Sequence, residues 1–171
     1  MKKILFGSVI LSVIFISCLK NADTKCSFND SSATASSTEI ADMQTYLNSQ
    51  SITGTTQHSS GFFYKINAVG TGTAVSNLCT TVTVRYKGRL TNGTIFDSTA
   101  TGAAVSFQLG QVIPGWQKGV PLIAKGGSIT LYIPPSLGYG ATPVTNQTTG
   151  AVIIPANSKL IFNIDLVDVT N

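Results

Sequence analysis

Apolar residues that recur at every second position are the feature that most constrains this chain. Residues 159–169 read KLIFNIDLVDV, with apolar residues at 160, 162, 164 and 166, and residues 81–90 read TVTVRYKGRL. In the second stretch Val82, Val84 and Tyr86 share one face. Because successive side chains of a strand point to opposite faces, this spacing predicts half-buried antiparallel strands.

The remaining pattern predicts an α+β fold. Residues 62–69, 105–109 and 126–133 have the composition and alternation of further strands. Residues 114–123, PGWQKGVPLI, begin with a proline and space their apolar residues three to four apart, which is typical of a short helix. We therefore expect a twisted antiparallel sheet packed on one short helix.

A second helix is expected ahead of the sheet. Residues 38–50 carry Ile40, Met43 and Leu47 at helical spacing, with Thr38 or Ser37 as the candidate N-cap. A long stretch rich in Gly, Pro and Thr, residues 134–157, is expected to be a loop.

The first residues, MKKILFGSVILSVIFISC, have the pattern of an export signal. Two lysines precede an apolar run from Ile4 to Ile16, which is too short to span a bilayer. The FISC ending resembles a bacterial lipobox, in which the cysteine, here Cys18, is lipidated. Phe15 departs from the usual Leu of that motif. The alternative is an ordinary cleaved signal, with Cys18 removed or left free.

This pattern predicts a chain in four parts, bound to the cell envelope. A lipoprotein-type signal peptide occupies residues 1–18, a polar flexible tether 19–37, a helical extension 38–60 and the main domain 61–171. A lipid on Cys18 would hold the protein on a membrane surface, either periplasmic or surface-exposed.

The cysteines allow one disulfide and give no sign of a metal site. The chain has 3 cysteines, and lipidation of Cys18 would leave Cys26 and Cys79, which could pair in an oxidising compartment. No CxxC motif or Cys/His cluster occurs, so neither a metal nor a cofactor is expected.

The charge pattern argues against nucleic-acid binding. The pI is near 9.1, but Lys2 and Lys3 lie in the segment expected to be removed. No basic stripe interleaves with aromatic residues in the rest of the chain.

Four motifs follow one another in a recognisable order. They are VTVRYKGRLTNGTIFDS at 82–98, VSFQLGQVIPGWQKGV at 105–120, GGSITLYIPPSLGYG at 126–140 and IIPANSKLIFNIDLV at 153–167. Over residues 61–169 the chain closely resembles the FKBP-type peptidyl-prolyl cis-trans isomerases. The resemblance implies a five- to six-stranded antiparallel sheet wrapped around one short helix, with an apolar pocket between them for prolyl peptides and macrolide inhibitors.

The resemblance also assigns the pocket residues. It implies that the Ile113 backbone N–H and the Tyr139 hydroxyl bind carbonyl groups of the substrate or inhibitor. Val105 replaces an aromatic residue of several eukaryotic members, and residues 141–152 form a longer loop than the compact family form. The implied catalytic residues are Tyr86, Asp97, Ile113, Trp116 and Tyr139, and the implied substrate-binding residues are Phe96, Val105, Val112, Ile154 and Phe162.

Simpler interpretations stay open at this point. Trp116, the only tryptophan, could fill the core, and Asp97 could be a turn residue after NGTIF. For function, the first hypothesis is a prolyl isomerase that assists the folding of exported proteins. The alternative is a non-catalytic FKBP-like peptide-binding or chaperone module on a membrane-anchored lipoprotein. The expected partners are prolyl-containing polypeptides and, through the lipid, a membrane.

Overall fold

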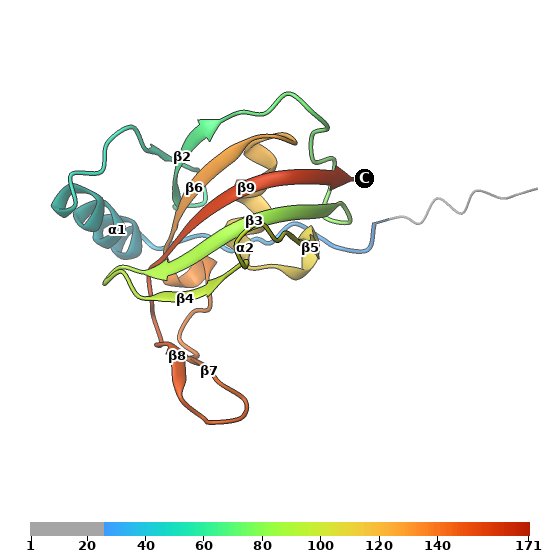
Figure 1. The fold of residues 1–171 in the computed structure, drawn as a ribbon. Helices are drawn as coiled ribbons and strands as arrows, with labels where there is room; N and C mark the ends of the chain where they lie inside the picture. Colours follow the sequence, from blue (N-terminus) through green and yellow to red (C-terminus); the bar gives the residue numbers. More distant parts are fainter. Residues whose placement is uncertain (1–25) are drawn as a thin grey trace, which may run out of the picture.

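The computed structural model describes residues 26–171, so the expected signal peptide and Cys18 lie outside the described residues. Within this part the chain forms a curved antiparallel sheet with α2 behind it (Figure 1). The helices and strands, in chain order, are α1 Ser37–Ser49, β1 Thr56–Gln57, β2 Phe63–Ala68, β3 Thr81–Leu90, β4 Ile95–Ser98, β5 Val105–Gln108, η1 Leu109–Gln111, α2 Pro114–Gly119, η2 Val120–Leu122, β6 Ser128–Ile133, η3 Pro135–Leu137, β7 Val144–Thr145, β8 Val152–Ile154 and β9 Leu160–Thr170.

The main sheet has the order β1-β2-β6-β9-β3-β4, with β5 also paired to β3. The outer edge of β3 is shared, since β5 pairs with residues 81–84 and β4 with residues 87–89. The expected α+β class is confirmed. The main sheet of residues 26–171 has seven strands rather than five or six, because the two-residue β1 adds a strand at one edge.

Side-chain alternation divides the buried residues into two cores, one on each face of the sheet. Leu160, Phe162 and Ile164 of β9 face α2 and belong to the larger core. Ile161 points the other way and packs with Met43 and the rest of the smaller core under α1. The run Leu160–Phe162 is therefore buried on both faces of the sheet, which explains why its residues are consecutively apolar.

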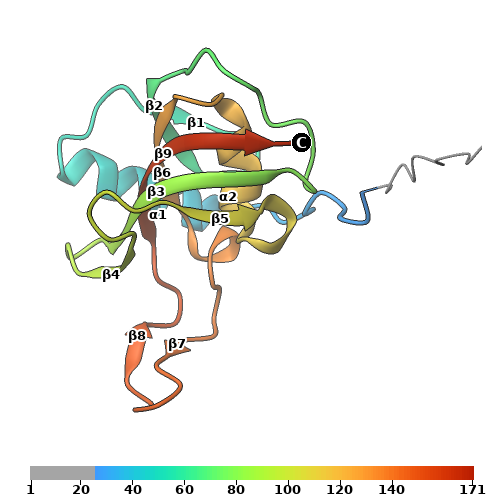
Figure 2. The same ribbon diagram turned by 45° about the vertical axis from the view of Figure 1, so that its right-hand side comes forward.

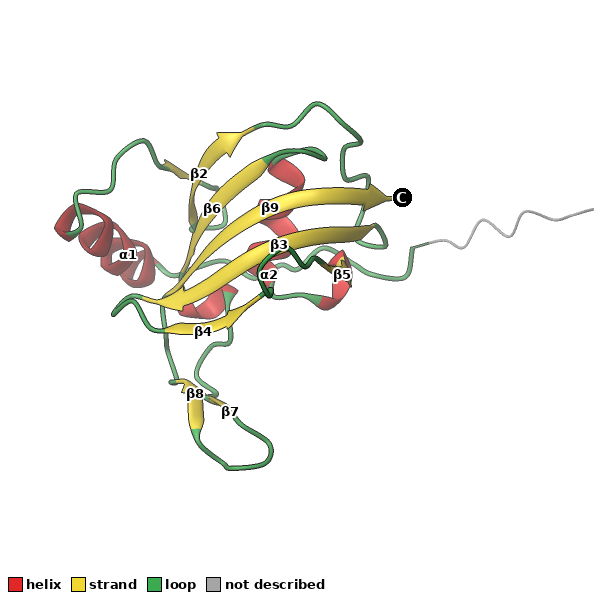
Figure 3. Cartoon of the chain, viewed as in Figure 1, coloured by secondary structure: helices red, strands yellow, loops and turns green. Residues whose placement is uncertain are grey.

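The helix α1 covers the second face, as its apolar spacing predicted. Its N-cap is Ser36, one residue before Ser37 and two before Thr38, because Ser36 and Glu39 form a capping box. The Ser36 side chain accepts from the Glu39 N–H, and the Glu39 carboxylate accepts from the Ser36 N–H. Figure 3 shows α1 at the opposite end of the sheet from the C-terminus.

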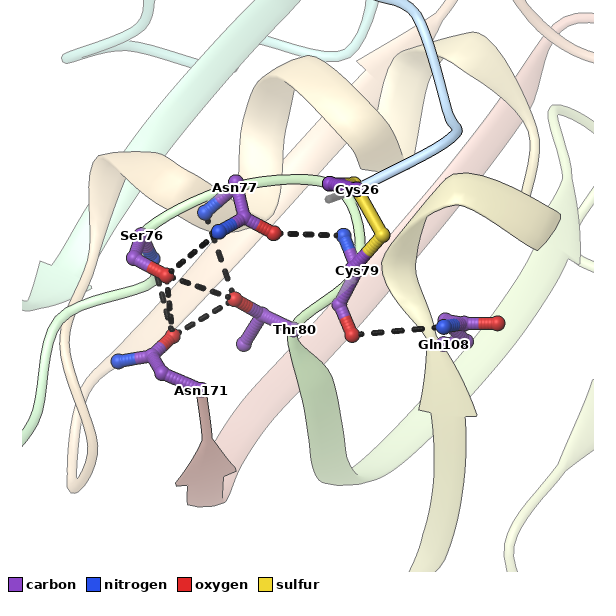
Figure 4. Close-up of a disulfide and its surroundings, with 7 residues drawn as sticks. All are labelled: Cys26, Ser76, Asn77, Cys79, Thr80, Gln108 and Asn171. Atoms are coloured by element: carbon purple, nitrogen blue, oxygen red, sulfur yellow. Dashed lines mark hydrogen bonds between the residues drawn. A yellow bond between two sulfur atoms is a disulfide. The ribbon is translucent and has the colours of Figure 1, made fainter. Parts of the chain in front are cut away.

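Residues 26–36 were expected to belong to a flexible tether, but the structure places them along the domain. Cys26 forms a disulfide with Cys79, two residues before the start of β3 (Figure 4). Phe28 packs on the larger core, and the Lys118 side chain donates to the Ser31 carbonyl at 2.6 Å. These contacts fix the segment because apolar burial and a covalent bond offset the entropy of a free tail.

The segment after β6 also differs from the loop that was expected. Residues 134–157 contain η3 and a two-stranded hairpin, β7–β8, which projects from the body of the molecule (Figure 2). Asn146 shapes its turn, because its side-chain oxygen accepts from the N–H groups of Thr148 and Thr149. Between Cys26 and Asn171, no helix combines the length and apolar character needed to cross a membrane.

Candidate functional site

A pocket of about 250 Å³ opens between α2 and the concave face of the sheet. It collects residues from β3, β4, β5, η1 and the loop after it, α2, β9 and the segment after η3. Its lining is mainly aromatic and aliphatic: Tyr86, Asp97, Phe107, Gln111, Val112, Ile113, Trp116, Tyr139 and Phe162.

Trp116 forms the centre of this pocket. Three rings meet the indole edge-on, with centroid distances of 5.3 Å for Tyr86, 6.0 Å for Phe107 and 5.2 Å for Phe162. The interplanar angles are 86°, 89° and 87°, which is the arrangement that aromatic quadrupoles favour. We call these four residues the aromatic box.

The indole nitrogen of Trp116 argues that the ring does more than fill space. The side chain is buried, and its Nε1 has no hydrogen-bond partner among the described residues. An unpaired buried donor costs about 1–3 kcal/mol, which a phenylalanine at this position would avoid. Core filling alone therefore does not account for tryptophan here.

The close approach of Phe96 to Phe162, a member of the box, depends on Gly88. Phe96 and Phe162 meet edge-on at 5.5 Å, and a Cβ at Gly88 would lie 2.7 Å from both rings. Gly88 sits opposite a β-bulge in β4, where the pairing passes from Gly88–Asp97 to Arg89–Ile95 and leaves Phe96 without a partner on β3. Asp97, the residue of β4 next to this bulge, lines the pocket.

Tyr86 and Asp97 are coupled at that mouth. The Tyr86 hydroxyl donates to Oδ2 of Asp97 at 2.5 Å, which orients both groups. Burial raises the pKa of the Tyr86 phenol, and the hydrogen bond to Asp97 and the charge of Asp97 raise it further. Tyr86 therefore stays protonated and remains a donor at neutral pH.

Two further hydrogen-bond donors lie at the pocket. The Ile113 N–H, at the start of α2, finds no acceptor in the described part of the chain. The Tyr139 side chain is 42% exposed and its pKa is raised by burial and then by the charge of Asp97, so it too stays protonated. Both groups are free to donate to a ligand that enters the pocket.

The backbone around Ile113 is held in place by Gln117. Its amide donates to the carbonyls of Val112 at 2.8 Å and Gly110 at 3.2 Å. Gln117 lies one residue beyond Trp116 on α2, so the same short helix carries the box and fixes the loop beside it. The sequence gives no signal for this role.

The structure brings together seven of the ten expected site residues. Phe96, Val105 and Ile154 do not line the pocket. Phe96 and Val105 pack against the larger core behind it, and Ile154 is a buried member of that core at the base of the hairpin. The seven that line it are Tyr86, Asp97, Val112, Ile113, Trp116, Tyr139 and Phe162.

Phe107 and Gln111 also line the pocket but were not expected there. Phe107 follows Val105 by two residues on β5, so both lie on the same face of the strand. Val105 has no aromatic ring, but Phe107, two residues later on β5, brings one to the pocket and contacts Tyr86 and Trp116. Period-two spacing in VSFQ was the available signal.

This arrangement can bind and desolvate a compact apolar group while donating hydrogen bonds at its rim. Among the described residues that line the pocket, Asp97 is the only charged one, and Tyr86 already occupies one of its oxygens. Between residues 26 and 171, no cluster of three or more His, Cys, Asp or Glu side chains is suited to hold a metal ion.

The sequence matches known proteins over most of this domain. FkpA, an FKBP-type peptidyl-prolyl cis-trans isomerase of Buchnera aphidicola, is 44% identical over 119 residues, covering 69% of this chain and 44% of the relative. FkpA of Escherichia coli K12 is 43% identical over 117 residues, covering 68% of this chain and 40% of the relative. The chain thus spans less than half the length of these curated relatives.

Solved structures and a family profile agree with these matches. The crystal structure of FkpA from Escherichia coli superposes with a TM-score of 0.65 at 38% identity, covering 78% of this chain and 60% of that chain. A peptidyl-prolyl cis-trans isomerase from Pseudomonas syringae gives 0.65 at 25% identity, covering 82% and 100%. The profile described as FKBP-type peptidyl-prolyl cis-trans isomerase matches residues 72–167, and the chain belongs to this family.

Proposed function

We propose that this chain catalyses cis–trans isomerisation of Xaa-Pro peptide bonds and so assists the folding of exported proteins. One observation carries the proposal. The aromatic box around Trp116 is bordered by two free donors, the Ile113 N–H and the Tyr139 hydroxyl. This arrangement suits a proline ring in the box and carbonyl groups at the rim.

The reaction asks for no acid, base or nucleophile. Rotation about the amide makes and breaks no covalent bond, and its barrier is about 18–20 kcal/mol. The planar amide is more dipolar than the twisted one, so an apolar pocket disfavours the planar ground state relative to the twisted form. Each reduction of about 1.4 kcal/mol in the barrier gives a tenfold gain in rate.

The donors at the rim would then select the twisted form. The Ile113 N–H and the Tyr139 hydroxyl accelerate rotation only if they bind the carbonyls of the twisted amide better than those of either planar form. In this mechanism Asp97 fixes Tyr86 against the indole and places a negative charge at the pocket edge. It transfers no proton.

A relaxation assay tests the activity. Catalytic amounts of the protein should accelerate the cis-to-trans relaxation of a proline-containing peptide, and a macrolide inhibitor should remove the acceleration. No acceleration at micromolar protein would reject the enzyme proposal. A protein that binds the macrolide without accelerating relaxation would be a binding module instead.

We further propose a lipid-anchored location in the cell envelope. The support is the signal-like segment 1–18 with Cys18 at its end. Mass spectrometry of the mature N-terminus tests this, since a diacylglyceryl group on Cys18 is expected. A mature chain that begins elsewhere, or an unmodified Cys18, would reject the anchor.

A second candidate function is the holding of unfolded chains without catalysis. The projecting β7–β8 hairpin favours it, because Val152 is 57% and Ile153 37% exposed on β8. Contiguous exposed apolar surface marks binding sites, and these two neighbouring residues would contribute to one. An aggregation assay with an unfolded client tests this function. Trp116→Ala should still suppress aggregation, and a variant with residues 144–152 shortened to a turn should not; this result would favour holding over isomerisation.

A further inference from the structure

One carboxylate of the N-terminal extension makes a long-range connection to the segment that carries Tyr139. Glu39 Oε1 accepts from the Ser136 N–H at 2.9 Å, and Oε2 accepts from the Ser136 hydroxyl at 3.0 Å. The two residues are 97 positions apart in the sequence. We call this pair of hydrogen bonds the Glu39–Ser136 clip.

The clip grips a turn that leads directly to the pocket. Ser136 is the central residue of η3, and the N–H groups of Gly138 and Gly140 both donate to the Pro135 carbonyl at 2.9 Å. Tyr139 lies between these two glycines. Fixing Ser136 therefore fixes the short, bonded turn that presents the Tyr139 hydroxyl at the rim.

The other end of the clip is itself held by several contacts. Glu39 also accepts from the Ser36 N–H at 2.9 Å in the capping box, and α1 is fixed by Met43 and Leu47, which are fully buried. Ahead of α1, the Cys26–Cys79 disulfide and the packing of Phe28 against Gly110 hold the segment to the domain. A carboxylate on a loose arm could not position anything, whereas this one can.

We propose that Glu39 is a positioning residue of the prolyl-isomerase site, acting through Ser136 on Tyr139. The inference rests on the proposed isomerase function and extends it to a residue outside the pocket. It gives the N-terminal extension a role in catalysis, because the extension supplies a contact that the sheet and α2 do not. Glu39 touches no substrate.

Three variants separate positioning from simple helix stability. Glu39→Ala removes the clip and half of the capping box. Ser36→Ala removes the capping hydroxyl, together with its bond to Glu39 Oε2, but leaves both contacts between Glu39 and Ser136, so it is the matched control. Glu39→Gln keeps one side-chain oxygen as an acceptor and should restore part of what Glu39→Ala loses.

The first measurement is amide hydrogen exchange over residues 134–141 in the full chain. Glu39→Ala should raise exchange in this segment, and Ser36→Ala should not. This readout needs no catalytic activity, so it tests the clip even if the isomerase proposal fails. Unchanged exchange in Glu39→Ala would overturn the inference.

The second measurement is kcat/KM for a proline-containing peptide, well below the unfolding temperature. Glu39→Ala should lower it by roughly three- to tenfold, with Glu39→Gln between it and the parent and Ser36→Ala at the parent value. In a Tyr139→Phe background the Glu39→Ala change should have little further effect, because its route through the hydroxyl is gone. Full additivity of the two changes, or equal losses in Glu39→Ala and Ser36→Ala, would overturn the inference.

Discussion

The Tyr86 hydroxyl on β3 donates to the Asp97 carboxylate on the neighbouring strand β4, and the ring of the same Tyr86 meets the Trp116 indole at an interplanar angle of 86°. One side chain therefore joins the charged edge of the pocket to its apolar centre. Removing either end of the pair should change the pocket while the sheet stays folded, since neither residue belongs to the buried core.

Asp97→Val should lower kcat/KM by roughly tenfold, because Tyr86 loses the acceptor that holds its ring beside the indole. Tyr86→Phe removes the same bond but keeps the ring, and should lower activity less. The peptide relaxation assay measures both variants, with circular dichroism to check the fold. Full activity in Asp97→Val would contradict the assigned role of the pair.

The pKa of Tyr86 gives a stability prediction for alkaline solution. Because the folded-state pKa is raised, the unfolded chain loses the phenolic proton first, and stability falls once the pH exceeds the ordinary tyrosine value of about 10. Tyr86→Phe should remove part of this loss. Tyr132 and Tyr139, whose pKa values are also raised, should leave a residual loss.

Urea unfolding at a series of pH values measures this difference. The parent should be more stable than Tyr86→Phe by about 1 kcal/mol at neutral pH, and the gap should narrow as the pH rises above 10. If the difference in unfolding free energy stays constant with pH, the pKa of the Tyr86 phenol is not raised by folding.

Trp116→Ala should abolish most activity and also destabilise the domain by about 3–5 kcal/mol. A control must separate these effects. Ile161→Ala also empties a fully buried position, but on the α1 face of β9 and away from the pocket. At a temperature where both variants are folded, Ile161→Ala should keep its kcat/KM and Trp116→Ala should not. If both variants keep the same fraction of the parent kcat/KM, Trp116 only fills the core.

The sequence predicted the sheet and the short helix because both are set by local periodicity. The even positions of β9 and the apolar spacing of α2 depend only on residues close in the chain. The family motifs then pointed to Trp116, Tyr86 and Asp97, which all line the pocket. The sheet and the short helix form as predicted because local pattern and tertiary burial demand the same residues.

What the sequence did not reveal depends on contacts between distant segments or on competing local signals. The Glu39–Ser136 clip joins residues 97 positions apart, and no local sequence pattern predicts it. The packing of residues 26–36 was hidden by their polar composition, which resembles that of a free tether. The N-cap at Ser36 was within reach, since the spacing from Ser36 to Glu39 is that of a capping box.

The Cys26–Cys79 disulfide should contribute substantially to stability. The bonded residues are 53 positions apart, and closing a loop of this length in the unfolded chain corresponds to about 4 kcal/mol in the chain-entropy description. The double variant Cys26→Ser/Cys79→Ser should therefore unfold at lower denaturant concentration. Reductant should shift the parent in the same direction and leave the double variant unchanged, and a shift in both would point to an effect unrelated to this bond.

Acid solution should expose the contribution of Glu39. Burial alone would raise the pKa of its carboxyl, but hydrogen bonds from the backbone and side chains of Ser36 and Ser136 outweigh this and lower it below its ordinary value of 4.5. A lowered pKa means that the stability it contributes is present above that value and is lost as the pH falls through the folded-state pKa. Glu39→Gln should be less stable than the parent at neutral pH.

The unfolding free energies of the parent and Glu39→Gln should converge in acid. Protonation of Glu39 removes the negative charge of the parent there, whereas the substitution removes it at every pH. Asp42→Asn is the matched control, since Asp42 lies on the same helix and its side chain makes none of these bonds. Its stability relative to the parent should change little between neutral and acid solution. A Glu39→Gln difference that does not shrink in acid would show that the charge of Glu39 contributes nothing to the clip.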